Sequence, residues 1–304
     1  MKKKEYTSFI KETGPLYPEA LIQKVNDRIN EYLKAYSDTP QILKKAITYS
    51  MNNGGKRLRP ILCLTVAKSL GKDCELVMPV ACAIEFIHTY SLIHDDLPAI
   101  DNDDFRRGLL TCHKKFGEDI AILAGDAIFA EAFNIILYKQ ESPPDILVKV
   151  LSEISLASGA HGMVAGQIVD VFFAGKKISK SLLEYMHTNK TGKLITAAVI
   201  SSAILSGASD DNIGLFKQYS ENIGLAFQIT DDLLDLESNI EITGKTPGKD
   251  LLQNKNTFPS LFGIEKSKKI AKEKISRAIQ IVQSMDVDKE WLIKIAQFIL
   301  QRKN

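Results

Sequence analysis

The sequence predicts an all-α protein whose 304 residues form a single domain, residues 1–304. Apolar residues recur at intervals of three and four along most of the chain, which is the spacing of one helix face, and the apolar–polar alternation of strands is rare. Short turn-like segments separate these stretches. No Gly/Ser-rich or Pro-rich linker, change of composition or internal repeat marks a second domain.

The clearest helical periodicity covers four stretches, residues 76–93, 146–158, 182–205 and 213–236. Helix joints are expected at four short segments of turn-like composition, residues 71–73, 142–145, 207–211 and 242–256. The apolar share of 45% and the charged share of 25% are those of a soluble globular protein with a large core.

Composition also excludes several classes of function. The formal net charge of +2 lacks the basic footprint of a nucleic-acid binder, so we expect no nucleic-acid partner. No apolar run follows the lysines after Met1, and no uncharged run reaches the ~18 residues of a membrane span, which indicates a cytoplasmic protein without stable membrane insertion. The four cysteines form no CxxC pair or metal-ligand spacing and favour a reduced setting: Cys63, Cys74, Cys82 and Cys112.

An acidic run at residues 95–104 directly follows the strongly apolar stretch 76–93. A solvated helix end is one interpretation of such a run. Glu85, His88 and Asp95 share nearly one stripe of the helix, however, and a polar stripe that leads to a carboxylate cluster is also how a helix lines a polar cavity. A buried, satisfied histidine remains the alternative for His88.

Asp101 lies six residues after Asp95 and on an ideal helix would point to another face. Pro98 lacks an amide donor and disfavours helix in the residue before it, so we expect a bend that turns Asp101 back towards Asp95. Arg106 and Arg107 follow at once. Mutual salt bridges would explain this mixture of charges, and so would carboxylates that hold divalent cations beside arginines that contact phosphate.

A second acidic cluster, Asp231, Asp232 and Asp235, has the spacing of an unbroken helix. Asp231 and Asp235 are one turn apart, and Gln228 lies on the same stripe as all three. Like charges at this spacing repel by ~0.2 to 0.5 kcal/mol per pair on an exposed helix, so a bound cation would relieve a cost. For the same reason, replacing Asp95 or Asp231 by alanine is expected to raise the thermal midpoint slightly in the absence of metal.

Together these residues resemble the trans-prenyltransferases, the family of farnesyl and geranylgeranyl diphosphate synthases. The likeness covers roughly residues 52–260. Three segments resemble the isopentenyl-binding motif and the first and second aspartate-rich motifs of that family: Gly54-Gly55-Lys56-Arg57-Leu58-Arg59-Pro60, residues 95–107 and residues 231–235. Four more fit in the same order: Phe116-Gly117-Glu118-Asp119, Leu123-Ala124-Gly125-Asp126, Gly166-Gln167-Ile168-Val169-Asp170 and Lys190-Thr191-Gly192. The family often has Gly-Lys-Pro after the arginine pair, whereas this chain has Gly108-Leu109-Leu110, which puts the shape of that loop in question.

The resemblance implies the isoprenoid synthase fold, a single-domain antiparallel helical bundle around a central cavity, with the aspartate-rich motifs facing each other across its mouth. It also implies a homodimer that condenses an allylic diphosphate, dimethylallyl or geranyl, head to tail with isopentenyl diphosphate, using about three Mg²⁺ ions per active site. The implied magnesium ligands are Asp95, Asp96, Asp101, Asp231, Asp232 and Asp235. The implied isopentenyl diphosphate ligands are Lys56, Arg59, His88 and Arg107, and those of the allylic diphosphate are Arg106, Lys190, Thr191, Gln228, Lys245 and Lys255. The six aspartates, Arg106 and Lys190 are the expected catalytic residues.

Tyr90 and Ser91 are the expected chain-length residues. Ser91 lies one turn before Asp95 on nearly the same face, whereas Tyr90 is rotated by about 140°, so geometry alone does not put its ring in the tunnel. The resemblance supplies that step, because bacterial-type farnesyl synthases carry an aromatic residue there and two extra residues between Asp95 and Asp101. The chain therefore most resembles a bacterial-type farnesyl diphosphate synthase. Core packing of Tyr90 is the alternative role, and geranylgeranyl diphosphate the alternative product.

Two rival functions are weighed against chain elongation. A terpene cyclase or head-to-head condensing enzyme resembles the same helical fold, but residues 55–60 and the second aspartate-rich motif favour elongation. A non-catalytic subunit or metal-binding scaffold made of the same helices is disfavoured by the retention of both acidic motifs.

Overall fold

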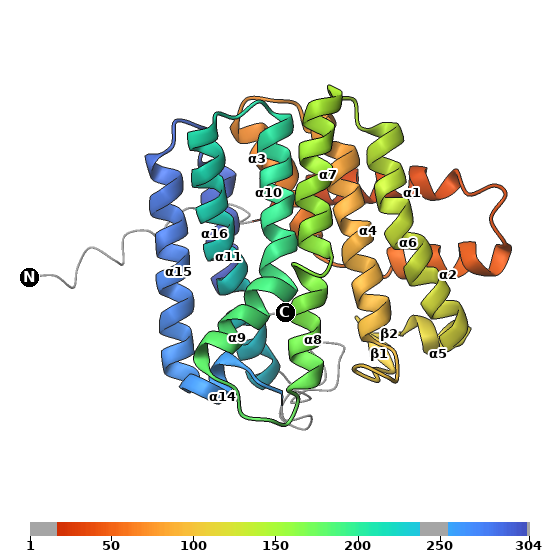
Figure 1. Cartoon of the computed structure of the whole chain (residues 1–304). Helices are drawn as coiled ribbons and strands as arrows, with labels where there is room; N and C mark the ends of the chain where they lie inside the picture. The colour runs from red at the N-terminus through yellow and green to blue at the C-terminus, as the bar shows by residue number, and fades with distance from the viewer. Residues whose placement is uncertain (1–16, 238–254, 303–304) are drawn as a thin grey trace, which may run out of the picture.

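Helices form where the three- and four-residue apolar spacing is strongest, and the all-α prediction is confirmed. The computed structural model describes residues 17–237 and 255–302, and its helices pack side by side as a bundle (Figure 1). In chain order the elements are α1 (Glu19–Lys34), α2 (Gln41–Met51), α3 (Leu58–Ser69), η1 (Cys74–Val77), α4 (Met78–Asp95), β1 (Phe105–Arg106), β2 (Leu109–Leu110), α5 (Cys112–Phe116), α6 (Glu118–Lys139), α7 (Pro144–Ser158), α8 (Met163–Phe172), α9 (Lys180–His187), η2 (Thr188–Gly192), α10 (Lys193–Leu205), α11 (Asp210–Glu237), α14 (Phe258–Phe262), α15 (Ile264–Ser284) and α16 (Glu290–Gln301).

The long helices match the predicted stretches. Residues 76–93 fall within η1 and α4, residues 146–158 within α7, and residues 213–236 within α11. The stretch 182–205 differs in detail, because α9 and α10 are joined without a loop by η2, a π-helical turn that carries Lys190. Such turns are frequent at functional sites. Of the predicted joints, the first three do separate helices, and most of the fourth lies outside the described residues.

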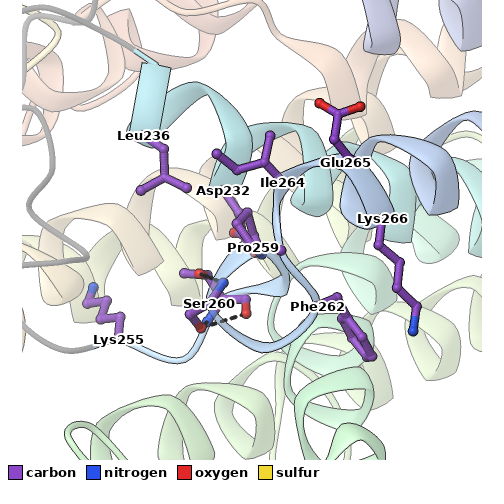
Figure 2. A pocket seen from close by; sticks show the side chains of 11 residues that line it. Asp232, Leu236, Lys255, Pro259, Ser260, Phe262, Ile264, Glu265 and Lys266 are labelled. Atoms are coloured by element: carbon purple, nitrogen blue, oxygen red, sulfur yellow. Dashed lines mark hydrogen bonds between the residues drawn. The ribbon is translucent and has the colours of Figure 1, made fainter.

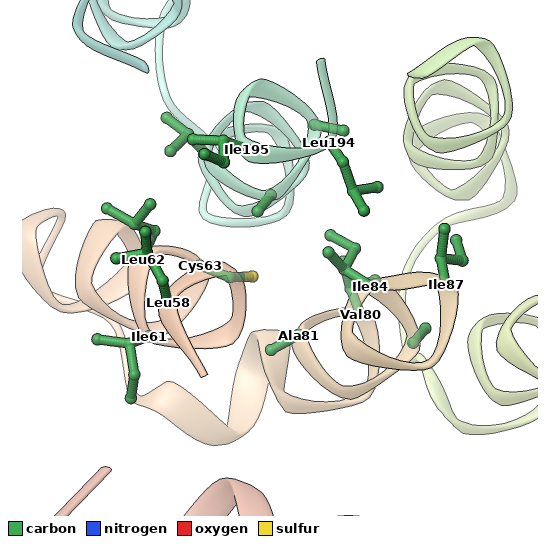
Figure 3. Packing of buried hydrophobic residues seen from close by; sticks show 14 of the residues in the cluster. Leu58, Ile61, Leu62, Cys63, Val80, Ala81, Ile84, Ile87, Leu194 and Ile195 are labelled. Carbon is green, nitrogen blue, oxygen red and sulfur yellow. The ribbon is translucent and has the colours of Figure 1, made fainter. Parts of the chain in front are cut away.

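The core that supports the acidic clusters is built around α3, α4 and α10. Most side chains of α3 and α4 are buried. Figure 3 shows Leu62 of α3, Ile84 of α4 and Leu194 of α10 among the apolar side chains that pack where these helices meet. The most extensive helix contacts join α4 to α6 and α11 to α15. The two helices that carry the acidic clusters, α4 and α11, are therefore both anchored along their length.

A small hairpin, which the sequence did not predict, follows the first acidic cluster. β1 and β2 pair antiparallel. Arg107 and Gly108 form the turn with φ of 53° and 77°, the left-handed values that a two-residue hairpin turn needs. The Tyr49 hydroxyl of α2 donates to the Leu110 carbonyl at 2.6 Å and ties the hairpin to the bundle. Leu109 and Leu110 thus form a regular strand where the family pattern has Lys-Pro.

Two further expectations concern the cysteines and the membrane. All four cysteines are buried and free. By length and composition alone, the helical stretches Cys74–Asp95 and Glu118–Lys139 of the described chain are apolar enough to cross a bilayer. The first is 72% buried inside the bundle, whereas only 39% of the second is buried. α6 therefore presents apolar surface on the outside of the described chain.

Candidate active site

A cavity of about 650 Å³ is lined by side chains of α4, α8, η2 and α11. Its wall contains most of the predicted site residues: Arg59, His88, Tyr90, Ser91, Asp95, Asp101, Arg106, Arg107, Lys190, Thr191, Gln228, Asp231, Asp232 and Lys255. Lys56, Asp96 and Asp235 are not part of that wall. Lys245 lies outside the described residues. Both acidic clusters and most of the predicted cationic residues therefore meet at one cavity.

The first acidic cluster lies where α4 ends and the chain turns. The helix stops at Asp95, before Pro98, and the Asp101 amide donates to the Asp95 carbonyl at 2.9 Å. The predicted bend is confirmed, and Asp95 and Asp101 line the same cavity. Burial raises the pKa of Asp95; the positive charge of Lys190 opposes this shift, and the negative charge of Asp101 adds to it.

Asp96, the second aspartate of this cluster, is bound by the protein itself. It is only 3% exposed. Arg106 of β1 donates to both carboxylate oxygens, from Nε at 2.8 and 2.9 Å and from Nη2 at 2.5 Å. A bidentate pair of this kind is both strong and oriented. Asp96 and Arg106, predicted as ligands of metal and phosphate, therefore fix the hairpin against the end of α4.

Both arginines of the segment 54–60 are buried, although Gly54 and Gly55 are exposed. Arg57 is 4% exposed and Arg59 7% exposed. The Arg57 guanidinium forms a buried ion pair of 2.8 Å with Glu85 of α4. Glu85 was expected to belong to a polar stripe that lines the cavity. It does not line the cavity, and it binds Arg57 instead. Arg59 does line the cavity.

Arg107 joins this turn to the hairpin. It donates to the Gly54 carbonyl. Gly55 has a φ of 118°, a backbone conformation that favours glycine, and a Cβ there would also displace the Arg107 guanidinium. Burial, with the nearby charges of Arg59 and Arg107, lowers the pKa of His88 well below its ordinary value. His88 is therefore neutral among arginines. Burial also lowers the pKa of Lys56 to about 8.

Two lysines pair with carboxylates at the cavity. Lys190 of η2 contacts Asp170 of α8 at 2.5 Å, and Lys255 contacts Asp101 at 2.9 Å. Burial alone would lower the pKa of each lysine, but the charge of Asp170 raises the pKa of Lys190 and that of Asp101 raises the pKa of Lys255. Both therefore stay positively charged. Gly166 makes the first contact possible, because a Cβ there would collide with the Lys190 backbone.

The second acidic cluster lies on the unbroken helix α11, as predicted, but its carboxylates do not share one environment. The Asp231 side chain is 42% exposed and forms an ion pair of 2.6 Å with Arg302, which follows α16. Asp232 is 3% exposed and accepts a hydrogen bond of 3.0 Å from the Phe258 amide. Asp235 lies one turn after Asp231 and is partly buried. Asp231 and Asp232 both line the cavity, as the expected shared face requires, and Asp232 also reaches the start of α14, whereas Asp235 is not part of that wall.

Sequence reasoning missed three residues at this site. Asp170 stands in a segment that resembled the family, and its role as the partner of Lys190 was open to inference. Arg302 has no motif around it, and only the fold brings it to Asp231. His187 ends α9 with its Nε2 3.5 Å from Asp232, and a lone histidine in an apolar stretch gives no signal.

The apolar part of the cavity lies between α4 and α8. Tyr90 lines it, and its ring packs against Phe129 of α6 with 4.8 Å between centroids. The Ser91 hydroxyl donates to the His88 carbonyl at 2.9 Å, so its polar end is satisfied within α4. Apolar side chains from α8, among them Ile168, face the same space. The wall thus changes from carboxylates and cations at the end of α4 to apolar side chains one turn below.

The carboxylates fit a hard divalent cation. Asp95 has no hydrogen-bond or ion-pair partner in the described part of the chain, although burial disfavours its charge. An oxygen donor in that situation suits Mg²⁺, which proteins commonly hold through one or two carboxylates together with substrate phosphates. Residues 17–237 and 255–302 contain no ready-made group of three or more His, Cys, Asp or Glu side chains for a metal.

Comparison with known proteins gives consistent matches over almost the whole chain. The family model described as polyprenyl synthetase matches residues 40–296. A geranylgeranyl diphosphate synthase of Cyanophora paradoxa is 45% identical over 282 residues, covering 92% of this chain and 93% of that protein. A farnesyl diphosphate synthase of Geobacillus stearothermophilus is 42% identical over 282 residues, covering 92% and 95%. The crystal structure of a geranyltransferase of Helicobacter pylori, complexed with magnesium and isoprenyl diphosphate, superposes with a TM-score of 0.80 at 29% identity and covers 96% of this chain and 98% of that one.

Proposed function

The chain belongs to the polyprenyl synthetase family of prenyltransferases, and we propose on that premise that it joins dimethylallyl or geranyl diphosphate to isopentenyl diphosphate, head to tail, and ends mainly at farnesyl diphosphate. One observation carries the proposal: a single cavity holds two carboxylate clusters, a group of cationic side chains and an apolar wall. A diphosphate ester with a long apolar tail needs these three surfaces in this arrangement.

Mg²⁺ is the cofactor, and we assign about three ions to each active site. Asp95 and Asp101 would hold ions on one side of the cavity, and Asp231 on the other, with Asp235 in reach one turn along α11. Bound Mg²⁺ neutralises the leaving diphosphate, which lowers the barrier to breaking the allylic carbon–oxygen bond. The chain's own cations share that task, because Lys190 and Lys255 stay protonated beside these carboxylates.

The two diphosphates are assigned to different parts of the cavity. Arg59 and Arg107 lie near the neutral His88, Lys56 lies near Arg107, and we assign these groups to the isopentenyl diphosphate site. The allylic diphosphate lies between the acidic clusters, near Lys190 and Lys255. Arginine suits the first role because its planar fork binds phosphate oxygens in pairs.

The reaction then needs little further chemistry from the protein. Departure of diphosphate leaves an allylic cation, the double bond of isopentenyl diphosphate attacks it, and a proton passes to the released diphosphate. Fixed charges in a site shielded from water act more strongly than in bulk solvent. The apolar wall around Tyr90 keeps water from the cation and from the growing tail.

Product length is assigned from Tyr90. Relatives with both product names are similarly close, at 45% and 42% identity, so the fifteen-carbon product depends on the aromatic ring that lines the cavity and is backed by Phe129. If that ring is the floor of the tunnel, Tyr90→Ala opens depth for another five-carbon unit. The second candidate is a geranylgeranyl diphosphate synthase, favoured by the match to the Cyanophora paradoxa enzyme.

The test supplies excess isopentenyl diphosphate with geranyl diphosphate and resolves the products by chromatography. We expect farnesyl diphosphate from the wild type and a large share of twenty-carbon product from Tyr90→Ala. Phe133→Ala is the matched control, because Phe133 packs edge-to-face against Phe129, with 5.3 Å between ring centroids, and lies outside the cavity wall. A twenty-carbon wild-type product, or an unchanged profile for Tyr90→Ala, would refute the farnesyl assignment and leave chain elongation intact. A wild type that makes no elongated product would refute chain elongation itself.

We also propose a homodimer in the cytoplasm, with α6 at the interface. Leu123 and Leu137 lie on one stripe of α6, are 57% and 53% exposed, and Tyr138 beside them is 80% exposed. A second copy that covers this stripe accounts for the apolar outer surface of α6 without membrane insertion. Leu137→Lys should shift the mass measured by light scattering from dimer to monomer.

The four free, buried cysteines support the proposed location in a reducing compartment.

A further inference from the structure

Asp232 has an environment unlike that of its neighbour Asp231. Its side chain is 2% exposed, against 42% for Asp231. One carboxylate oxygen, Oδ2, accepts the Phe258 amide at 3.0 Å and lies 3.5 Å from Nε2 of His187. The other, Oδ1, accepts the side-chain amide of Gln228 at 2.9 Å. Both oxygens are therefore already engaged by donors from the chain.

Two of these partners, His187 and Gln228, connect Asp232 to η2. His187 is the last residue of α9 and directly precedes the π-helical turn. Gln228 accepts the Thr191 hydroxyl at 2.7 Å while it donates to Asp232, so a continuous chain of hydrogen bonds runs from Thr191 through Gln228 to Asp232. Lys190, beside Thr191, is held by this turn at the cavity wall.

The third partner, the Phe258 amide, connects Asp232 to the segment at the start of α14. Thr257 and Ser260 form a capping box, whose two hydrogen bonds fix the start of α14 around the Phe258 amide. Figure 2 shows Asp232 next to the turn that carries Pro259 and Ser260, with Lys255 where the segment begins. The Phe258 ring packs near the His187 ring, with 5.4 Å between centroids, and closes the contact between the two segments.

We propose that Asp232 is not a magnesium ligand but a positioning residue that holds the Lys190–Thr191 turn and the Lys255–Thr257 segment at the allylic diphosphate site. The proposal rests on the proposed function, because that function makes these segments the allylic site. Rotation of the carboxylate towards a metal would leave the buried Phe258 amide and the Gln228 side chain without an acceptor, which is unfavourable in a site closed to water. Orientation of substrate-binding groups by a buried hydrogen-bonded carboxylate is a common means of holding a site.

The first test compares Asp232→Asn with Asp231→Asn, adjacent changes that each remove one charge. Mn²⁺ binding is titrated by electron paramagnetic resonance in the presence of inorganic diphosphate. We expect Asp231→Asn to weaken Mn²⁺ binding about tenfold or more and Asp232→Asn to change it by less than about twofold. Equal weakening by the two variants would make Asp232 a metal ligand and overturn the proposal.

The second test separates positioning from charge and from simple loss of stability. Asp232→Asn keeps an oxygen acceptor, whereas Asp232→Ala does not. We expect the KM for geranyl diphosphate to rise about twofold in the first and about tenfold in the second, with the KM for isopentenyl diphosphate unchanged in both. Equal defects in the two variants, or equal changes in both KM values, would contradict a positioning role.

The third test needs no variant and no catalysis. Hydrogen exchange of the metal-free wild type should show the Phe258 amide strongly protected, because Asp232 accepts it without help from metal or substrate. Exchange at the rate of an unprotected amide would overturn the proposal even if every variant failed to fold. Because the Mn²⁺ and exchange measurements do not depend on product, they decide this inference separately from the test of chain elongation.

Discussion

The two acidic clusters share one plan and differ in how the chain builds it. In each, two consecutive aspartates divide between two environments: Asp95 and Asp231 are the more exposed, whereas Asp96 and Asp232 are each 3% exposed and accept a hydrogen bond from another element, although Asp232 also lines the cavity. The first cluster sits where α4 ends, however, and the second on the unbroken helix α11. The first therefore depends on a loop and the second on helix geometry.

They differ also in the cation that faces the accessible aspartate. Asp231 has a resident cation in Arg302, at 2.6 Å. Asp95 has no ion-pair partner in the described part of the chain, and longer-range attraction to Lys190 and Arg106 only opposes the effect of its burial. Without metal, Asp231 thus has a resident counter-charge from the protein and Asp95 does not. That asymmetry is what the following predictions test.

The largest expected effect is the loss of turnover when either accessible aspartate is removed. Asp95→Ala and Asp231→Ala should each lower kcat by ~10²-fold or more, because each removes a contact that stabilises the departing diphosphate through metal. Steady-state kinetics at saturating Mg²⁺ measure it, with circular dichroism as the check of folding. Near wild-type turnover in either variant would mean that the two clusters do not act together.

The next effect is a limb of the pH–activity profile that depends on Lys56, whose pKa responds both to Asp231 of the second cluster and to Arg107. Burial lowers the pKa of Lys56 to about 8, with Arg302 lowering it further and Asp231 raising it. As pH rises through 8 this lysine loses its charge, so kcat/KM for isopentenyl diphosphate should fall up to about tenfold per pH unit. Lys56→Arg should move that limb to higher pH, since arginine stays charged. A limb at the same pH in Lys56→Arg would assign it to another group.

A smaller effect is expected on metal affinity when the resident cation is removed. Mg²⁺ has to displace Arg302 from Asp231, so Arg302→Met should strengthen Mn²⁺ binding to the substrate-free enzyme, by about two- to fivefold for an ion pair worth up to ~1 kcal/mol. Calorimetric titration measures it. Lys294→Met is the control, because Lys294 lies on the same side of the fold in α16 but pairs with Glu290 at 2.6 Å. Weaker binding in Arg302→Met would mean that Arg302 assists the metal.

The contrast between a loop and an unbroken helix also explains which parts of this site the sequence could predict. Asp231 to Asp235 could be placed because an unbroken helix fixes their angles, and the bend that returns Asp101 to Asp95 could be inferred from Pro98. The partners could not. Arg302 reaches Asp231, and Phe258 reaches Asp232, only through the packing of α14 to α16 against α11, and helical spacing carries no information on contacts of that range.

The β1–β2 hairpin is a second feature that the spacing of apolar residues could not predict. Two adjacent residues with left-handed backbone, Arg107 and Gly108, make a turn that hydrophobic periodicity does not report. Glu85 was placed on the correct stripe of α4, but its buried partner Arg57 came from another segment, and that pairing removed it from the cavity. Local geometry was predictable, and the choice of partner was not.

The smallest expected effect is on thermal stability without metal, where the asymmetry corrects the expectation that both replacements stabilise. Asp95→Asn should raise the midpoint by about 1–3 °C, because it removes a charge that burial disfavours. Asp231→Asn should lower it by about 2–4 °C, since it leaves Arg302, 3% exposed, without its carboxylate, a cost of ~1 kcal/mol at this half-exposed pair. Scanning calorimetry with EDTA measures both.

The sign of the pH dependence provides the control for this last prediction. The pKa of Asp95 is raised in the folded state above its unfolded value. Its contribution to stability is therefore fully present below the unfolded pKa and is lost as pH rises through the folded pKa. The advantage of Asp95→Asn should accordingly be largest near pH 7 and shrink towards pH 4, as the wild-type carboxyl takes up its proton. A constant advantage across that range would trace the gain to a local packing change, and two midpoints shifted in the same direction would show that the clusters are compensated alike.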